Sequence, residues 1–156
     1  SESEDSLKKI FISATRPLKW KNHETLKKAF LMAQIENKDI ILDEESAPYK
    51  KFLEKMKNCY AVILVSIGDI SPNMILDAIR MGKPFILTKE NGLNERLKEI
   101  GVFVDPFDIE DIKNKILFLS NPLNYKIIKE KIKQFNFTHS WGDICEEFIS
   151  IYKKIK

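Results

Sequence analysis

The stretch AVILVSIGDISPNMILDAIRMGKPFIL, residues 61–87, contains a strand, a helix and a second strand in a row. Its first five residues are apolar without alternation, as in a parallel strand that is covered on both faces. Apolar residues then recur at helical spacing, namely Ile75, Ala78 and Ile79. Gly82 followed by Pro84 predicts the end of this helix before the apolar run 85–87. The stretch therefore predicts one β-α-β unit of a parallel sheet.

The same alternation continues on both sides of this unit. Short apolar runs predict further strands at residues 10–12, 40–42 and 102–104. Apolar residues at helical spacing predict helices over 26–33, 49–56, 93–97, 109–119, 123–132 and 140–155. In the helix that Pro48 opens, Tyr49, Phe52, Leu53 and Met56 are expected to form a buried stripe. The pattern predicts an α/β fold: a Rossmann-like three-layer sandwich, with a parallel sheet of about five strands and helices on both faces.

Length and composition are those of one soluble globular domain. We expect residues 1–8 to be a linker or cut end, and residues 9–156 to form a single domain. The net charge of +3 is small, so it does not argue for nucleic acid as a partner. No apolar run approaches the roughly 20 residues of a membrane span, and the opening is acidic and polar, so we expect neither a membrane span nor a signal peptide. Cys59 and Cys145 stand in apolar contexts, which predicts reduced core thiols and a cytoplasmic location.

The topology predicts where a ligand would bind. In open parallel sheets, ligands bind beyond the carboxyl ends of the strands. Three loops meet this condition: residues 13–21, 66–72 and 88–92. We therefore look for functional residues in these loops and at the helix starts that follow them.

The first of these loops carries two cations, Arg16 and Lys21, just before a helix start. Both side chains suit phosphate oxygens, and a helix N-terminus adds free N–H groups. His23, at the start of that helix, could also contact the ligand. The alternative is that Arg16 and Lys21 are solvated loop cations and that His23 has no contact with ligand.

The loop after the central strand contains Asp69, and the helix that follows contains Asp77. Ser71 or Asn73 could cap this helix, which would place Asp77 on its second turn. A carboxylate there can accept two hydrogen bonds from a vicinal diol such as a ribose. The alternative is that Asp69 is a loop acid and Asp77 a helix acid that faces solvent.

Several motifs are absent from the sequence. There is no Gly-x-Gly-x-x-Gly motif and no P-loop, which argues against a Rossmann dehydrogenase or an NTPase. There is also no Asp-x-Asp pair and no Cys/His spacing for zinc, and His23 lies far from His139. His139 precedes the last predicted helix and is expected to be structural. We expect no metal site and no cofactor.

The segment from Ser66 to Ile86 resembles the signature of retaining glycosyltransferases of family 4, which have the GT-B fold. That signature is an acidic residue, seven others, a second acidic residue, then Ala and a Gly-Lys-Pro turn into a strand; here the acids are Asp69 and Asp77. The similarity covers most of the chain, with further matching segments at 16–30, 91–95, 101–106 and 137–152. The resemblance implies the donor-binding, C-terminal domain of such an enzyme.

The resemblance also implies roles for single residues. Asp77 would bind the ribose of a nucleotide-sugar, and Asp69 would face the donor sugar. Arg16 and Lys21 would stabilise the departing nucleoside diphosphate in place of a metal ion. The other expected donor-binding residues are Thr15, Ser71, Asn73 and Met74.

Three departures from the family pattern bear on these roles. Both acids are Asp where the family usually has Glu, so each carboxylate reaches roughly 1.5 Å less far. Pro72 stands where glycine is common, and proline has no N–H to offer phosphate. The region 34–42 is shorter than in the family, so we expect a strand-helix unit that helps to wall the base pocket to be trimmed here.

The expected partners follow from the resemblance. They are a nucleotide-sugar donor and an N-terminal domain that binds the acceptor, and the full enzyme would associate peripherally with membranes. Without that second domain the chain would bind donor but not turn over. The alternative is a Rossmann-like interaction module that has lost transfer activity, which the two Asp residues and Pro72 favour. A nucleic-acid-binding domain is less favoured, because the lysines are spread over several helices with acids between them.

Overall fold

The fold is built on one parallel sheet. The computed structural model describes residues 8–13, 22–67, 72–89, 94–138, 146 and 149–150. Its five strands are β1 (Lys9–Ser13), β2 (Ile40–Asp43), β3 (Ala61–Leu64), β4 (Phe85–Thr88) and β5 (Val102–Val104). They pair in the order β2-β1-β3-β4-β5, and every neighbouring pair is parallel. The predicted α/β class and the predicted strands are therefore confirmed.

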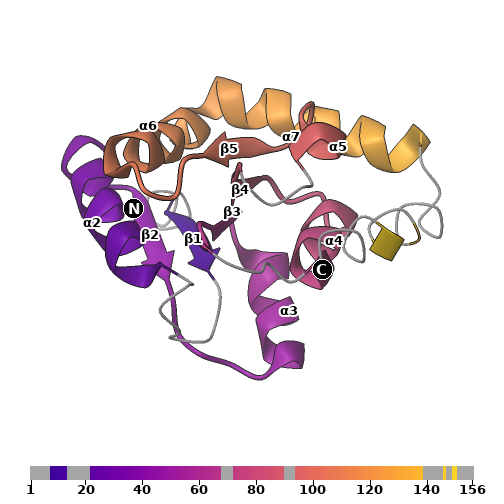
Figure 1. The fold of residues 1–156 in the computed structure, drawn as a ribbon, viewed down its shortest axis with the longest axis horizontal. Helices are drawn as coiled ribbons and strands as arrows, with labels where there is room; N and C mark the ends of the chain where they lie inside the picture. The colour runs from indigo at the N-terminus through magenta and orange to yellow at the C-terminus, as the bar shows by residue number, and fades with distance from the viewer. Residues whose placement is uncertain are drawn as a thin grey trace.

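Helices cover both faces of this sheet. They are α2 (His23–Glu36), α3 (Tyr49–Asn58), α4 (Pro72–Arg80), α5 (Asn94–Leu97), α6 (Ile109–Ser120) and α7 (Pro122–Thr138). Helices α2 and α6 pack on each other on one side of the sheet, while α3 and α4 lie on the other side (Figure 1). The result is the predicted three-layer sandwich. The predicted last helix, 140–155, lies almost wholly outside the described residues.

Helix α7 crosses the amino edge of the sheet. The Tyr125 hydroxyl on α7 donates to the Tyr60 carbonyl, directly before β3, at 2.8 Å. Near the other end of α7, Asn136 Nδ2 donates to the Ile79 carbonyl of α4 at 2.7 Å. The helix therefore reaches from α6 to α4 at the end of the sheet opposite to the predicted ligand site (Figure 1).

The core is apolar and continuous through the sheet. All four residues of β3 and all four of β4 are buried, as expected for central parallel strands. Helices pack onto them with residues that the helical spacing predicted, among them Leu26, Phe30, Phe52, Met56, Ile75, Ile79, Ile112 and Ile116. The buried stripe of α3 is narrower than predicted, because its first member, Tyr49, is 52% exposed.

The end of α4 is the glycine stop that the sequence predicts. Gly82 has a φ of 69°, a left-handed conformation that residues with a Cβ adopt only at a cost. The N–H of Lys83 donates to the Ala78 carbonyl at 2.8 Å, and that of Gly82 to the Ile79 carbonyl at 3.0 Å. These two bonds form a Schellman motif, which satisfies the last carbonyls of the helix and turns the chain into β4.

Candidate functional site

Buried polar residues gather at the carboxyl edge of the sheet. Five polar residues are buried in the part of the chain that the structure describes. Four of them lie at this edge: Ser13, Asn22, Ser66 and Thr88. The fifth, Ser120, donates to the Ile116 carbonyl within its own helix at 2.6 Å. Polar groups thus interrupt the apolar interior mainly where the topology predicts a ligand site.

Asn22 joins three of the segments that form this edge. It directly precedes α2 with a φ of 64°, a left-handed conformation that Asn tolerates better than most residues. Its side-chain Nδ2 donates to the carbonyl of Val65 at 3.1 Å and to that of Pro106 at 2.7 Å. These bonds tie the connection after β1 to the chain after β3 and after β5. No role was predicted for Asn22. The available signal in the sequence was its position directly before a helix start, since Asn is a polar residue that tolerates positive φ.

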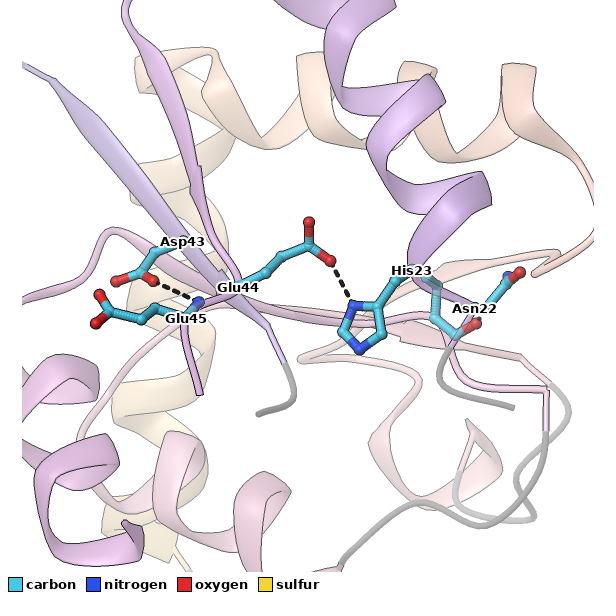
Figure 2. Close-up of polar contacts among 6 residues, drawn as sticks. Asn22, His23, Asp43, Glu44 and Glu45 are labelled. Atoms are coloured by element: carbon cyan, nitrogen blue, oxygen red, sulfur yellow. Dashed lines mark hydrogen bonds and ion pairs between the residues drawn. The ribbon is translucent and has the colours of Figure 1, made fainter. Parts of the chain in front are cut away.

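His23 and Glu44 face each other across this edge. His23 begins α2, Glu44 directly follows β2, and His23 Nδ1 is hydrogen-bonded to Glu44 Oε2 (Figure 2). The two side chains are only 17% and 15% exposed. The histidine singled out in the sequence is therefore held by a carboxylate of its own chain. No role was predicted for Glu44.

The neighbouring acids of this loop are also paired. Asp43 ends β2, and its Oδ1 accepts the backbone N–H of Glu45 at 2.9 Å (Figure 2). Lys55 of α3 lies 3.3 Å from Asp43 Oδ2 and 3.6 Å from Glu45 Oε2. Lys55 therefore balances these two carboxylates, and the loop after β2 is anchored to α3.

The Asp77 carboxylate is hydrogen-bonded to Tyr49 and does not simply face solvent. Asp77 lies on the second turn of α4, as predicted, and its side chain is half-buried. The Tyr49 hydroxyl, from the first turn of α3, donates to Asp77 Oδ2. Partial burial and this bond to a carboxylate raise the pKa of Tyr49 to about 12. The predicted burial of Tyr49 in the stripe of α3 is wrong, because its hydroxyl is directed to Asp77.

The other predicted site residues divide into two groups. On α4, Asn73 is exposed, and Met74 packs partly buried against the core. Since α4 begins at Pro72, both lie in its first turn. The remaining predicted residues lie outside the described residues: Thr15, Arg16, Lys21, Asp69, Ser71 and His139.

No group of three or more His, Cys, Asp or Glu side chains in the described ranges is arranged to hold a metal ion. Among the helices that the structure describes, none is both long enough and apolar enough to cross a membrane.

Comparison with known proteins gives a structural match only. The sequence matches no known family model and no characterised protein sequence. The C-terminal domain of a group 1 glycosyl transferase, LpcC of Francisella tularensis, is similar in structure, with a TM-score of 0.66 at 18% identity. That match covers 83% of this chain and 85% of the other.

Two further solved structures have the same score. The catalytic domain of cholesterol-α-glucosyltransferase from Helicobacter pylori has a TM-score of 0.66 at 17% identity, over 80% of this chain and 96% of that one. Anabaena HepE, solved with UDP and glucose, has a TM-score of 0.66 at 15% identity. That match covers 99% of this chain but only 51% of HepE, so this chain spans about half of that protein. The chain has the fold of the C-terminal domain of GT-B glycosyltransferases.

Proposed function

We propose that this chain is the donor-binding domain of a retaining, metal-independent glycosyltransferase. The enzyme would transfer a sugar from a nucleoside-diphosphate sugar to an acceptor glycan, lipid or small molecule. The observation that carries the proposal is the polar carboxyl edge of the sheet, with Asp77 beside it, in a fold shared with LpcC and HepE. HepE was solved with UDP and glucose, which supports a nucleotide-sugar as the ligand of this edge.

Each part of the donor (ribose, sugar and diphosphate) is assigned to particular residues. Asp77 accepts hydrogen bonds from the ribose, and Asp69 faces the sugar. Arg16 and Lys21 stabilise the negative charge that develops on the leaving diphosphate, which a metal ion does in other transferases. Thr15, Ser71, Asn73 and Met74 complete the contacts with the donor.

The acceptor is assigned to a second domain. This chain matches about half of HepE, and in the proposal an N-terminal domain supplies the acceptor site across a cleft. The chain alone would bind donor without turning it over. In this proposal the protein is cytoplasmic, and the full enzyme, with both domains, associates peripherally with membranes. The free, buried thiol of Cys59 is in keeping with a reducing compartment.

Titration of the ¹⁵N-labelled chain with UDP, GDP, ADP and their sugars tests this proposal. We expect amide shifts near Arg16, Lys21, Asn73 and Asp77 with one of these nucleotides. Asp77→Ala and Arg16→Ala should weaken that binding while the melting temperature stays nearly the same. Asp39→Ala is a matched control, because Asp39 is an exposed acid in the turn before β2, at the amino edge. If no nucleotide shifts any of these residues, the proposal is wrong.

A specific observation favours the second candidate, an interaction module without transfer activity. Pro72 is the first residue of α4, so one N–H is missing from the helix end that would approach the donor phosphate or sugar. The two candidates differ in nucleotide binding, so the same titration separates them.

A further inference from the structure

A groove lies between the end of α4 and α7, at the amino edge of the sheet, far from the predicted donor site. Its volume is about 570 Å³, within the range of small-molecule sites. Arg80, Met81 and Gly82 form one wall. The other wall consists of α7 residues: Tyr125, Lys126, Lys129, Glu130, Lys133 and Asn136.

Four of these nine lining residues are cations, against one acid, Glu130. Lys126, Lys129 and Lys133 follow one stripe of α7 at i, i+3 and i+7, a row roughly 10 Å long at 1.5 Å per residue. Arg80, the last residue of α4, lies on the opposite wall. Cations therefore lie along the length of the groove and on both of its walls.

The charges of the three lysines are not balanced by carboxylates. Within the described ranges, no salt bridge involves Lys126, Lys129 or Lys133. Lys129 instead lies over the Tyr125 ring, 5.7 Å from its centre. Like charges at this spacing repel one another, and Glu130, the one acid of this wall, offsets only part of that repulsion.

The surroundings of the groove add to its positive potential. Lys83, close behind Gly82, is half-buried and donates from Nζ to the Cys59 carbonyl at 2.9 Å. Burial lowers the pKa of Lys83, and the charge of Lys129 lowers it further. The charge of Lys129 therefore also acts on Lys83, the residue that follows Gly82.

We propose that this groove binds a ligand with several phosphate groups, at a site separate from the donor site. Phosphate oxygens would lie along Lys126, Lys129 and Lys133, with Arg80 on the opposite wall. Tyr125 and Met81 provide apolar surface for the rest of the ligand. Such phosphates could belong to a soluble metabolite or to lipid headgroups. The proposal does not depend on the proposed transferase function.

Titration of the ¹⁵N-labelled chain with sodium pyrophosphate tests the site, and amide shifts locate it. We expect shifts at Met81, Gly82 and Lys129, in addition to any at Asn22 and His23 on the opposite edge. Lys129→Gln combined with Lys133→Gln should raise the Kd at the groove roughly tenfold. Lys131→Gln combined with Lys98→Gln is the matched control, because it removes two exposed lysines that do not line the groove and should leave this Kd unchanged.

Sedimentation with vesicles separates the two sources of phosphate. Vesicles of phosphatidylcholine and phosphatidylglycerol (3:1) are compared with pure phosphatidylcholine at 0.1 M salt. If the groove variant loses binding to anionic vesicles and the control variant retains it, lipid headgroups are the source. If pyrophosphate shifts the groove amides and no vesicle binds, the source is soluble. Pyrophosphate shifts confined to the carboxyl edge, with vesicle binding equal in both variants or absent, would overturn the proposal.

Discussion

The Tyr49 hydroxyl donates a hydrogen bond to the Asp77 carboxylate and so joins the first turn of α3 to the second turn of α4. The bond occupies one oxygen of Asp77 and leaves the second for another donor. It also restricts the rotation of a side chain that is one methylene shorter than the usual Glu. Tyr49 is thus placed to position the carboxylate to which we assign the ribose.

Tyr49→Phe is expected to reduce discrimination between ribose and 2′-deoxyribose. Without the hydroxyl, Asp77 is less well oriented, and a contact to the ribose hydroxyls should lose about 1 kcal/mol, or roughly fivefold. The measurement is the ratio of Kd values for a nucleotide and its 2′-deoxy form. Tyr125→Phe serves as control, because the Tyr125 hydroxyl bonds at the opposite edge. If both nucleotides weaken by the same factor in Tyr49→Phe, Tyr49 does not position Asp77 for ribose.

Substitution of Asn22 should separate its backbone role from its side-chain role. Asn22→Gly keeps the positive φ but removes the bonds to Val65 and Pro106, which should cost about 1–3 kcal/mol of unfolding free energy. Asn22→Ala also forces a Cβ into the left-handed region, at an added cost of about 1–2 kcal/mol. Urea denaturation measures both values. Equal stability of the Gly and Ala variants would contradict this division.

Gly82→Ala is expected to destabilise the protein through backbone conformation alone. Nothing lies within 4 Å of a Cβ built at Gly82, but its φ of 69° is unfavourable for alanine. We expect a loss of about 1–2 kcal/mol in urea denaturation. Gly82→Asn should lose less, because Asn enters the left-handed region more readily. A loss as large for Asn as for Ala would show that the cost is not conformational.

Asp111 should make the stability dependent on pH in acid. Burial alone would raise its pKa, but the Asp105 N–H at 2.8 Å and Lys115 at 3.0 Å outweigh burial and lower it. A lowered folded-state pKa stabilises the protein above the unfolded value of 3.8, and this contribution is lost as the pH falls through the folded value.

The test of this linkage is Asp111→Asn. The variant should be less stable at pH 7, by about 1 kcal/mol or less because the group is partly exposed to solvent. The difference should shrink as the pH is lowered below 4, and urea denaturation between pH 2 and pH 7 follows it. The control is Asp39→Asn, which replaces an exposed acid in the turn before β2. A difference between the wild type and Asp111→Asn that is constant over this range would contradict the assignment.

The strands, the helices and the stop at Gly82 could be predicted from the sequence, because each depends on local signals. Apolar runs, helical spacing and a glycine before proline act within a few residues of one another. The carboxyl edge, where we propose that the donor binds, could also be located from the sequence, since all parallel strands end on the same side. Asp77 was placed correctly on the second turn of its helix for the same local reason.

Contacts between distant segments were decided only by the tertiary structure. Tyr49 looked like a core residue, because aromatic residues at helical spacing usually are, yet α3 and α4 lie side by side and place its hydroxyl against Asp77, 28 positions away. Asn22 reaches Val65, 43 positions away, because β1 and β3 are neighbouring strands, and it reaches Pro106, 84 positions away, because α2 packs on α6. The basic groove forms for a related reason: α7 crosses the amino edge and places its lysines opposite Arg80. Local signals determine the elements, but the order in which they pack determines which side chains meet.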